Sequence, residues 1–167
     1  MAKNKEPIQD TGEISESIYD LVSFRMSMVS NSNERTGQLW LSRKHGLTLT
    51  EFRLLALINT HGSATSNTLR RITLLDKGQL SRTIKRLKEQ NYIQATQETE
   101  NLRSPSLKLT AEGLVKYRPI FKSVVKQNNL ILENITQEES NTLFTILKKM
   151  QPYFDRRLHE EETFKKQ

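Results

Sequence analysis

The stretch LDKGQLSRTIKRLKEQNYI, from Leu75 to Ile93, decides the fold of this chain of 167 residues. Its apolar residues Leu80, Ile84 and Leu87 recur at intervals of four and three, which places them on one stripe of a helix. Most of the other positions are polar or basic. The stretch therefore predicts an amphipathic helix over residues 77–90 that turns its apolar stripe towards a core.

The outward face of this predicted helix has the chemistry of a nucleic-acid reader. Asp76 stands where an N-cap is expected, and Gln79, three residues later, can complete a reciprocal cap. A helix rich in Arg, Lys, Gln, Ser and Thr has the size and the donors to enter the major groove of DNA. An ordinary helix with a solvated basic face is the alternative, so the neighbouring elements must decide. The side chains opposite the apolar stripe are Gly78, Arg82, Lys85, Arg86 and Glu89.

The positive charge of the chain is concentrated in its middle third. Residues 66–126 contain 13 Lys and Arg and 5 Asp and Glu, a local net charge of +8, whereas the rest of the chain contains 13 and 14, a net charge of −1. A focused basic region is the footprint of a protein that binds a polyanion. A charge excess that only favours solubility is the alternative, but it does not require this segregation.

The composition also excludes or disfavours several kinds of site. The chain has no cysteine, which excludes disulfides, thiolate zinc sites and thiol redox switches. Its histidines, His45, His61 and His159, do not stand at metal-binding spacing, and there is no Gly-rich phosphate loop, so we expect no enzyme, no metal and no cofactor. No apolar run is long enough to cross a membrane and the N-terminus has no signal pattern, so we expect a cytoplasmic protein without a membrane partner.

Two short helices are predicted directly before the basic helix. Thr50 can cap a helix over EFRLLALINTH that Gly62 ends, and Thr65 can cap a second helix over SNTLRRITLL. Short helices joined through a tight link to a basic helix form a helix-turn-helix. The side chains expected to face the core are Phe52, Leu54, Leu55, Leu57, Ile58, Leu69, Ile72 and Leu75.

The pattern after the basic helix is that of a β-hairpin. Residues 93–98, IQATQE, and 106–110, SLKLT, alternate as strands do, and the turn-like segment between them contains Arg103. A hairpin after a helix-turn-helix makes a winged helix, whose tip can carry Arg103 to an adjacent minor groove. The predicted fold is therefore mainly α, a winged helix-turn-helix with a two-stranded wing.

A longer helix is predicted before the winged helix. Residues 14–30 form it, a polar break follows at 31–37, and a short helix at 38–44 is stopped by Gly46. The first of these segments carries more apolar side chains than one neighbouring helix would cover.

Two long helices are predicted after the wing. Residues 111–134 form the first, which Thr110 can cap and which Pro119 is expected to kink or break. Residues 137–157 form the second, opened by a capping box of Thr136 with a Glu three residues later, and the polar tail beyond it is expected to fray.

These flanking helices predict a homodimer. Their surplus apolar surface is of the kind that usually marks an interface, and interlocked terminal segments of two chains would bury it. A two-fold dimer would present two basic helices about one turn of DNA apart to a palindromic site. The expected organisation is a loose arm at 1–12, dimerisation helices at 13–34 and 111–160, and a winged-helix DNA-binding domain at 36–110.

In this order the elements resemble those of the multiple-antibiotic-resistance regulator (MarR) family. The resemblance covers roughly residues 13–158, and its most specific part is DKGQLSRTIKRLKEQNYI followed by LKLTAEG. It implies a dimeric winged-helix transcriptional regulator that binds palindromic promoter DNA and often releases it on binding a small ligand. Two departures are the wing tip ENLRSPS, which has no Gly and carries Glu100 where Asp is common, and Pro119.

The resemblance places residues 77–86 in the major groove, Arg103 in the minor groove, and Ser66 and Thr68 on phosphate. From its chemistry, Arg82 is expected to read guanine, with a phosphate contact as the alternative. Other basic side chains of the helix are expected to bind phosphate. The predicted DNA-binding residues are Ser66, Thr68, Lys77, Gly78, Gln79, Ser81, Arg82, Lys85, Arg86 and Arg103.

The resemblance also implies a pocket for an effector between the winged helix and the dimerisation helices. By position, its candidates are Phe24, Met28, Trp40, Arg43 and His45. A tryptophan near an arginine would suit an aromatic carboxylate or a phenol. The alternative is that Trp40 belongs to the core.

The sequence therefore predicts a dimeric regulator of transcription that recognises a pseudo-palindromic site in double-stranded DNA and acts at the nucleoid of a bacterium or archaeon. A non-specific architectural or protein-interaction winged helix is the alternative. Selection from a random DNA pool distinguishes the two, because only the first enriches a palindrome. The resemblance implies a small aromatic effector, and a regulator without a ligand response is the alternative.

Overall fold

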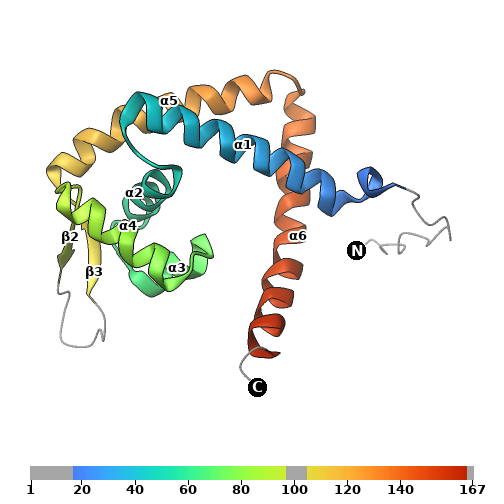
Figure 1. The fold of residues 1–167 in the computed structure, drawn as a ribbon. Coiled ribbons are helices and arrows are strands. Elements are labelled where there is room, and N and C mark those ends of the chain that lie inside the picture. The colour runs from blue at the N-terminus through green and yellow to red at the C-terminus, as the bar shows by residue number, and fades with distance from the viewer. Residues whose placement is uncertain (1–16, 97–104, 165–167) are drawn as a thin grey trace, which may run out of the picture. The chain divides into compact units, whose positions relative to one another are not determined.

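The computed structural model describes residues 17–96 and 105–164, drawn in colour in Figure 1. The chain divides into two compact units, residues 1–114 and 115–167. The first unit contains helices α1 to α4 and a small sheet, and the second contains most of α5 and all of α6. Among the described residues, no helix is both long enough and apolar enough to cross a membrane.

The first long helix, α1 (Val22–His45), follows a 3-10 turn, η1 (Ile18–Asp20), and runs without interruption (Figure 1). The predicted break at residues 31–37 is therefore wrong, because this polar segment is helical. The predicted end is confirmed: Gly46, with a φ of 65°, adopts the left-handed conformation and closes the helix.

Contacts with the next helix, α2 (Leu49–His61), show what the polar segment of α1 does. Glu34 accepts a hydrogen bond from Arg53 at 3.0 Å, and Gln38 accepts one from the backbone N–H of Leu49 at 2.9 Å. Glu34, one of the polar side chains that suggested a break, therefore binds α2, and Gln38, just after that segment, binds the backbone at the start of α2. They attach α1 to α2 beside the buried apolar contacts.

Thr48, and not Thr50, caps α2. Its hydroxyl accepts from the backbone N–H of Glu51 at 3.1 Å, and Glu51 Oε2 accepts from the backbone N–H of Thr48 at 2.7 Å, which completes a capping box. Gly62, with a φ of 72°, ends the helix as predicted. The buried apolar side chains of α2 are Phe52, Leu54, Leu55 and Ile58, while Leu57 is half-buried.

Helix α3 (Ser66–Thr73) begins at the predicted cap, since Thr65 accepts from the backbone N–H of Thr68 at 3.2 Å. Its Leu69 is buried as predicted, but Ile72 is 45% exposed, so the prediction that it faces the core is wrong. The helix ends soon after Ile72, and its C-cap, Leu74, takes a left-handed conformation with a φ of 56°.

Helix α4 (Lys77–Glu89) is the predicted basic helix. Leu80 and Leu87 are buried and Ile84 is half-buried, so the apolar stripe faces the core as predicted. The buried apolar side chains around it in the first unit include Leu41, Leu47, Leu54, Leu55, Ile58, Leu69, Ile93 and Leu107.

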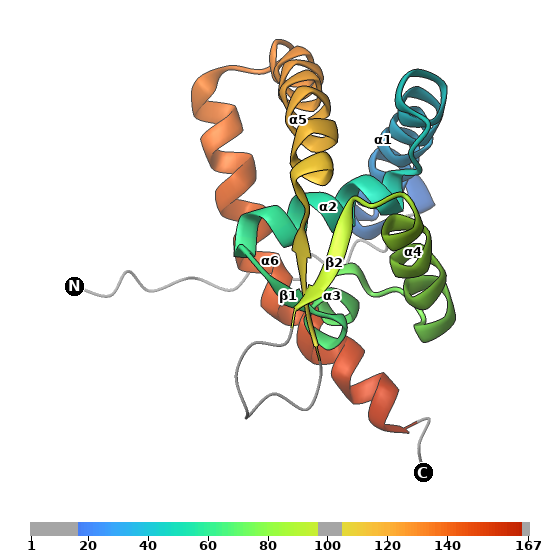
Figure 2. The same cartoon turned by 90° about the vertical axis from the view of Figure 1, so that its left-hand side faces the viewer.

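The sheet has three antiparallel strands in the order β1-β3-β2 (Figure 2). Strands β2 (Ile93–Thr96) and β3 (Ser106–Leu109) form the predicted hairpin, with Ile93 opposite Leu109. The third strand, β1 (Ala64–Thr65), was not predicted; it lies between α2 and α3 in the chain and places Ala64 opposite Leu107. It ties the base of the wing to the start of α3.

Helix α5 (Ala111–Leu132) begins at the predicted cap, since the hydroxyl of Thr110 accepts from the backbone N–H of Gly113 at 2.9 Å. It is not broken at Pro119, which lies inside one continuous helix. Proline removes one helical N–H donor, and that single loss does not end a helix of 22 residues.

Helix α6 (Gln137–Phe164) opens with the predicted capping box. Glu139 Oε2 accepts from the backbone N–H of Thr136 at 2.7 Å, and the hydroxyl of Thr136 accepts from the backbone N–H of Glu139 at 3.2 Å. The backbone N–H groups of Thr136 and Glu139 therefore both have hydrogen-bond acceptors.

The C-terminal part of α6 is longer than predicted. The tail that was expected to fray from His159 is helical as far as Phe164. Arg157 donates to Glu160 and to Glu161, each at 3.1 Å, which are the pairs expected at a spacing of three and four residues in a helix. The polar composition of the tail thus supports the helix instead of ending it.

Candidate nucleic-acid interface

The first turns of α4 present exposed side chains behind a well-formed cap. Asp76 Oδ1 accepts a hydrogen bond from the backbone N–H of Gln79 at 2.7 Å, which confirms the predicted N-cap. In helix-turn-helix proteins, the N-terminal residues of the recognition helix contact base edges. Four predicted DNA-binding residues are exposed here: Lys77, Gly78, Gln79 and Ser81.

Arg82 lies over Gly78, one turn earlier. A Cβ atom added at Gly78 would stand 3.3 Å from Nη1 of Arg82 and 3.2 Å from Oδ1 of Asp76. The guanidinium group therefore occupies space that a side chain at position 78 would contest. Gly78 was predicted as a DNA-binding residue, and in the structure a side chain at this position would crowd the arginine expected to read a base.

Lys85 is exposed on the next turn of α4. Its Nζ lies 3.8 Å from Oε1 of Glu89, and both side chains are more than 60% exposed, at 78% and 62%. An ion pair of this kind contributes little to stability, so the lysine can exchange this partner for a phosphate. This geometry suits the predicted phosphate contact.

Arg86 has a partner inside the protein. Its Nε lies 2.9 Å from Oε1 of Glu51 in α2; the side chain of Arg86 is 54% exposed and that of Glu51 only 2%. Sequence reasoning assigned Arg86 to phosphate and did not single out Glu51. The signal that could have found Glu51 is the spacing Thr-x-x-Glu from Thr48, which predicts a capping box and a fixed carboxylate.

The start of α3 contains two predicted phosphate-binding residues. Ser66 is exposed, whereas Thr68 is half-buried and its hydroxyl lies 3.1 Å from that of Thr65. Two adjacent exposed cations on the same helix, Arg70 and Arg71, were not among the predicted site residues. Their signal was available, because exposed arginines on the helix before a recognition helix are candidates for phosphate contacts.

A tight joint connects the end of α4 to the start of α5. The hydroxyl of Thr110 donates to the backbone oxygen of Asn91 at 2.5 Å, and its backbone N–H donates to that of Tyr92 at 3.1 Å. A Cβ atom at Gly113 would stand only 1.9 Å from the backbone oxygen of Tyr92. The glycine of the sequence LTAEG is therefore required by the close approach of two backbone segments.

The remaining predicted contact belongs to the wing. Strands β2 and β3 pair from Ile93 opposite Leu109 to Thr96 opposite Ser106, which orients the hairpin. Arg103, the predicted minor-groove residue, lies outside the described residues.

The predicted effector-binding residues fall into two groups on α1. The rings of Trp40 and His45 pack edge to face with centroids 4.9 Å apart, and Arg43 is exposed nearby in the chain. Phe24 packs instead against an aromatic ring of η1, and Met28 is exposed. Because Phe24 and Trp40 are about 24 Å apart along the helix at 1.5 Å per residue, one chain does not bring the five residues together.

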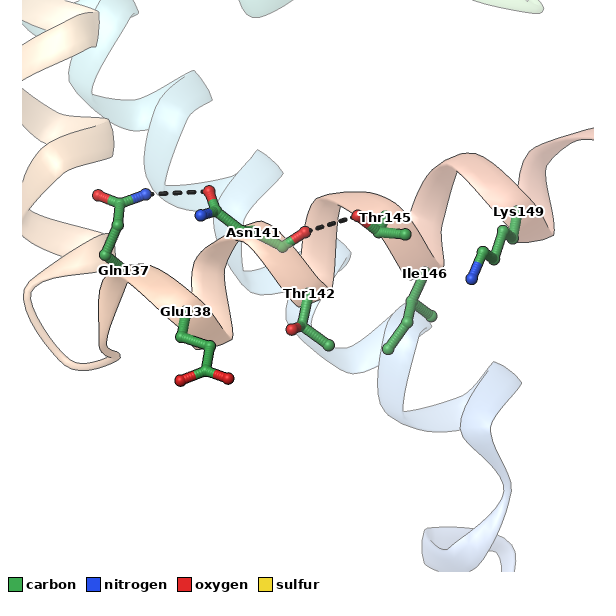
Figure 3. Close-up of a pocket in the computed structure, with 7 residues that line it drawn as sticks. All are labelled: Gln137, Glu138, Asn141, Thr142, Thr145, Ile146 and Lys149. Atoms are coloured by element: carbon green, nitrogen blue, oxygen red, sulfur yellow. Dashed lines mark hydrogen bonds between the residues drawn. The ribbon is translucent and has the colours of Figure 1, made fainter. Parts of the chain in front are cut away.

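An open hollow on α6 contains none of these candidates. Figure 3 shows that its polar lining includes the hydrogen bond from Gln137 to Asn141 and the one from Thr145 to the backbone of Asn141. Within the described part of the chain, no three His, Asp or Glu side chains gather as a metal site would require. All the lining residues belong to one helix: Gln137, Glu138, Asn141, Thr142, Thr145, Ile146 and Lys149.

Comparison with known sequences gives a consistent result. The sequence model of the MarR family matches residues 45–104, which run from the end of α1 into the wing. The HTH-type transcriptional regulator SarZ of Staphylococcus haemolyticus (strain JCSC1435) is 31% identical over 108 residues, which cover 64% of this chain and 71% of SarZ.

Solved structures share the fold over more of the chain. A MarR/EmrR family transcriptional regulator from Acinetobacter sp. ADP1 superposes with a TM-score of 0.74 and 25% identity, covering 80% of this chain and 94% of its own. A mutant MarR from E. coli, complexed with operator DNA, superposes with a TM-score of 0.66 and 24% identity, covering 77% and 91%. The winged-helix fold predicted from the sequence is thereby confirmed.

Proposed function

The chain belongs to the MarR family of winged-helix transcriptional regulators, and from this premise we propose that it binds a pseudo-palindromic site in double-stranded DNA as a homodimer. Helix α4 enters the major groove and the wing enters the adjacent minor groove. The family and the fold are those of transcriptional regulators and not of enzymes. The proposed place of action is therefore the DNA itself, at the nucleoid in the cytoplasm.

One observation carries the proposal: α4 is capped, has its apolar stripe buried, and exposes its polar and basic residues. This arrangement supports insertion of the helix into the groove, with Gln79, Ser81 and Arg82 near base edges and Lys77 and Lys85 near phosphate. Ser66 and Arg103 extend the contacts to either side. The operator DNA bound by the MarR relative supports the same mode of binding.

The test compares two exposed cations of α4. A duplex enriched from a random pool and a scrambled duplex of equal composition are bound by wild type, Arg82→Ala and Lys85→Ala in gel-shift titrations. Arg82→Ala should lose discrimination between the duplexes by about tenfold or more, because a bidentate guanine contact contributes about 1–3 kcal/mol. Lys85→Ala should weaken both complexes alike, because phosphate contacts carry no sequence information.

Equal losses on every probe for both variants would contradict the assignment of Arg82. Enrichment of no site by the wild type would instead favour a non-specific architectural or protein-interaction module. The same pool selection also tests the dimer, because a palindrome with half-sites about one helical turn apart requires two copies of α4.

A response to a small aromatic effector is a separate part of the proposal. The packed pair of Trp40 and His45, with Arg43 exposed beside it in the chain, supports this region of α1 as the place where an aromatic acid or phenol binds. The test is a thermal-shift screen of aromatic acids and phenols at millimolar concentration, because a ligand that prefers the folded state raises the melting temperature. A compound that raises it should also release the selected duplex.

If no compound shifts the melting temperature and none releases the duplex, the proposed effector response is wrong, while the proposed DNA binding is unaffected.

A further inference from the structure

The pair formed by Glu51 and Arg86 differs from the ion pairs of Arg53 with Glu34, of Lys85 with Glu89 and of Arg157 with Glu160 and Glu161, because one of its partners is buried. The carboxylate of Glu51 is held on both oxygens: Oε1 lies 2.9 Å from Nε of Arg86, and Oε2 accepts from the backbone N–H and the hydroxyl of Thr48 at 2.7 and 3.0 Å. A carboxylate bound on both oxygens has little freedom to turn. Glu51 is therefore a fixed point at the start of α2.

Arg86 links Glu51 to α4, the helix proposed to read DNA. It stands one turn after Arg82 and next to Lys85, so the three share one region of the α4 surface. The buried side chains of α4 are apolar, Leu80 and Leu87. Apolar contacts are non-directional, whereas a charged hydrogen bond from a guanidinium has a defined geometry.

This difference has a consequence for recognition. Side chains that read bases must be held within about 0.5 Å and 10–20° of the productive geometry. Because apolar contacts are non-directional, they do not by themselves specify the rotation of a helix to that precision. The directional bond from Arg86 to the fixed carboxylate of Glu51 restricts the rotation of α4.

We propose that Glu51 and Arg86 form a clamp that sets the orientation of α4 on the body of the winged helix, and that this orientation determines sequence discrimination. This inference rests on the proposed function, and it gives Arg86 a positioning role in place of the phosphate contact expected from the sequence. Glu51, at 2% exposure, reaches no DNA; besides capping α2 with Thr48, it acts on α4 through Arg86.

The experiment uses the full chain and measures the affinity of wild type, Glu51→Gln, Arg86→Gln and the double variant for the pool-enriched duplex and for the scrambled duplex, each over a range of salt concentrations. Glu51→Gln should lower discrimination about tenfold. The affinity of Glu51→Gln for the scrambled duplex should stay the same or rise, because the charge of Arg86 is no longer neutralised by a carboxylate. The double variant should discriminate no worse than the single variants, because one contact is removed in each case.

The matched control is Lys85→Gln, which removes the neighbouring cation. It should lower both affinities and reduce the salt slope by about 0.9, as the loss of one phosphate contact does. If Arg86→Gln behaves like Lys85→Gln and Glu51→Gln discriminates as wild type does, the clamp is wrong and Arg86 is a phosphate ligand. If wild type itself prefers no duplex, the proposed function fails together with the clamp.

A second measurement does not depend on how well the variants fold. In the wild-type protein without DNA, the Nε–H of Arg86 should be resolved by NMR and exchange slowly with water, and it should remain so when the selected duplex is added. Fast exchange in the absence of DNA, or loss of protection on binding, would show that the pair does not hold α4 during recognition and would overturn the proposal.

Discussion

At the scale of single residues, Gly113 is the position where one added methyl group should matter most. Because its Cβ would stand 1.9 Å from the backbone oxygen of Tyr92, Gly113→Ala forces the joint between α4 and α5 apart. We expect a loss of about 2 kcal/mol or more in the free energy of unfolding, the size of a severe overpacking. Chemical denaturation followed by circular dichroism measures it.

Gly37→Ala is the matched control, because Gly37 also lies inside a helix. Its Cβ would stand 3.6 Å from the nearest atom, Cδ1 of Leu49, which is an ordinary contact. Alanine is the better helix former by up to about 1 kcal/mol, so this variant should be as stable as wild type or more stable. Similar losses at both positions would mean that the close approach at Gly113 does not exist in solution.

Leu74 is the second residue whose backbone makes a prediction. It is 68% exposed and takes a φ of 56°, a left-handed conformation that costs most L-residues roughly 1–2 kcal/mol. Leu74→Gly removes this strain. It also raises the conformational entropy of the unfolded chain, which offsets part of the gain in stability. We expect a net gain of about 0.5 kcal/mol, measured as a rise in melting temperature.

The control for this prediction is Asn91→Gly, at the second non-glycine residue with a positive φ, of 57°, among those that the structure describes. Asparagine tolerates the left-handed region better than leucine does, so the gain should be smaller than at Leu74. A fall in melting temperature for Leu74→Gly would show that the leucine side chain makes a contact that outweighs its strain.

At the scale of elements, the start of α6 should respond to acid. The backbone hydrogen bond from Thr136, followed by the one from its hydroxyl, lowers the pKa of Glu139 below its ordinary value of 4.5. Because the folded pKa is the lower one, the capping box contributes stability above pH 4.5, and this contribution is lost as pH falls through the lowered pKa. An NMR titration of the Glu139 carboxyl carbon should show the lowered midpoint.

The functional consequence is local fraying of α6 in acid. Amide exchange in its first turn should accelerate as the carboxylate of Glu139 takes up its proton, and Glu139→Gln should make that exchange less dependent on pH. Glu138→Gln, one residue away, is the control and should leave the dependence as in wild type. An ordinary midpoint for Glu139 would contradict the reciprocal cap.

The elements that could be predicted from the sequence are those with local signals of their own. Helix α4 combines an apolar stripe with a cap at Asp76, and α6 opens with the box of Thr136 and Glu139; both appear where predicted. The hairpin was predicted from its period of two, and its strands β2 and β3 are present. In each case the signal lies within a few residues of the element that it specifies.

The elements that escaped prediction depend on partners distant in the sequence. The polar run at residues 31–37 continues α1, and Glu34 within it binds Arg53 of α2, a distant partner that nothing in the run itself indicates. Strand β1 has only two residues, too few for any period, and exists because β3 lies beside it. The clamp of Glu51 on Arg86 joins residues 35 positions apart, which no local pattern reveals.

At the scale of the whole molecule, the exposed apolar side chains of α6 predict the effect of disrupting the proposed dimer. Leu147 and Phe154 are exposed in the single chain, so replacing both by Glu should leave the winged helix folded. We expect the double variant to sediment as a single chain and to lose about 100-fold or more in affinity for the selected duplex, because two linked half-site contacts become one.

Thr142→Glu is the control for this change, since Thr142 is also exposed on α6 but is polar. It should sediment and bind as wild type does. A Leu147→Glu/Phe154→Glu protein that remains a dimer would assign the interface to other apolar residues, such as Val22, Val29 or Phe121. A variant that becomes a single chain but still binds tightly would contradict the need for two copies.

The unbroken course of α1 also bears on how this protein can be re-engineered. Residue 35, where the dimerisation segment was expected to give way to the DNA-binding domain, lies in the middle of α1, so a chimera joined there would place the junction inside a continuous helix. Gly46 is the natural seam, because the backbone already reverses its handedness there. A chimera that carries a relative's winged helix after Gly46 should bind the relative's operator while α1 of this protein stays intact.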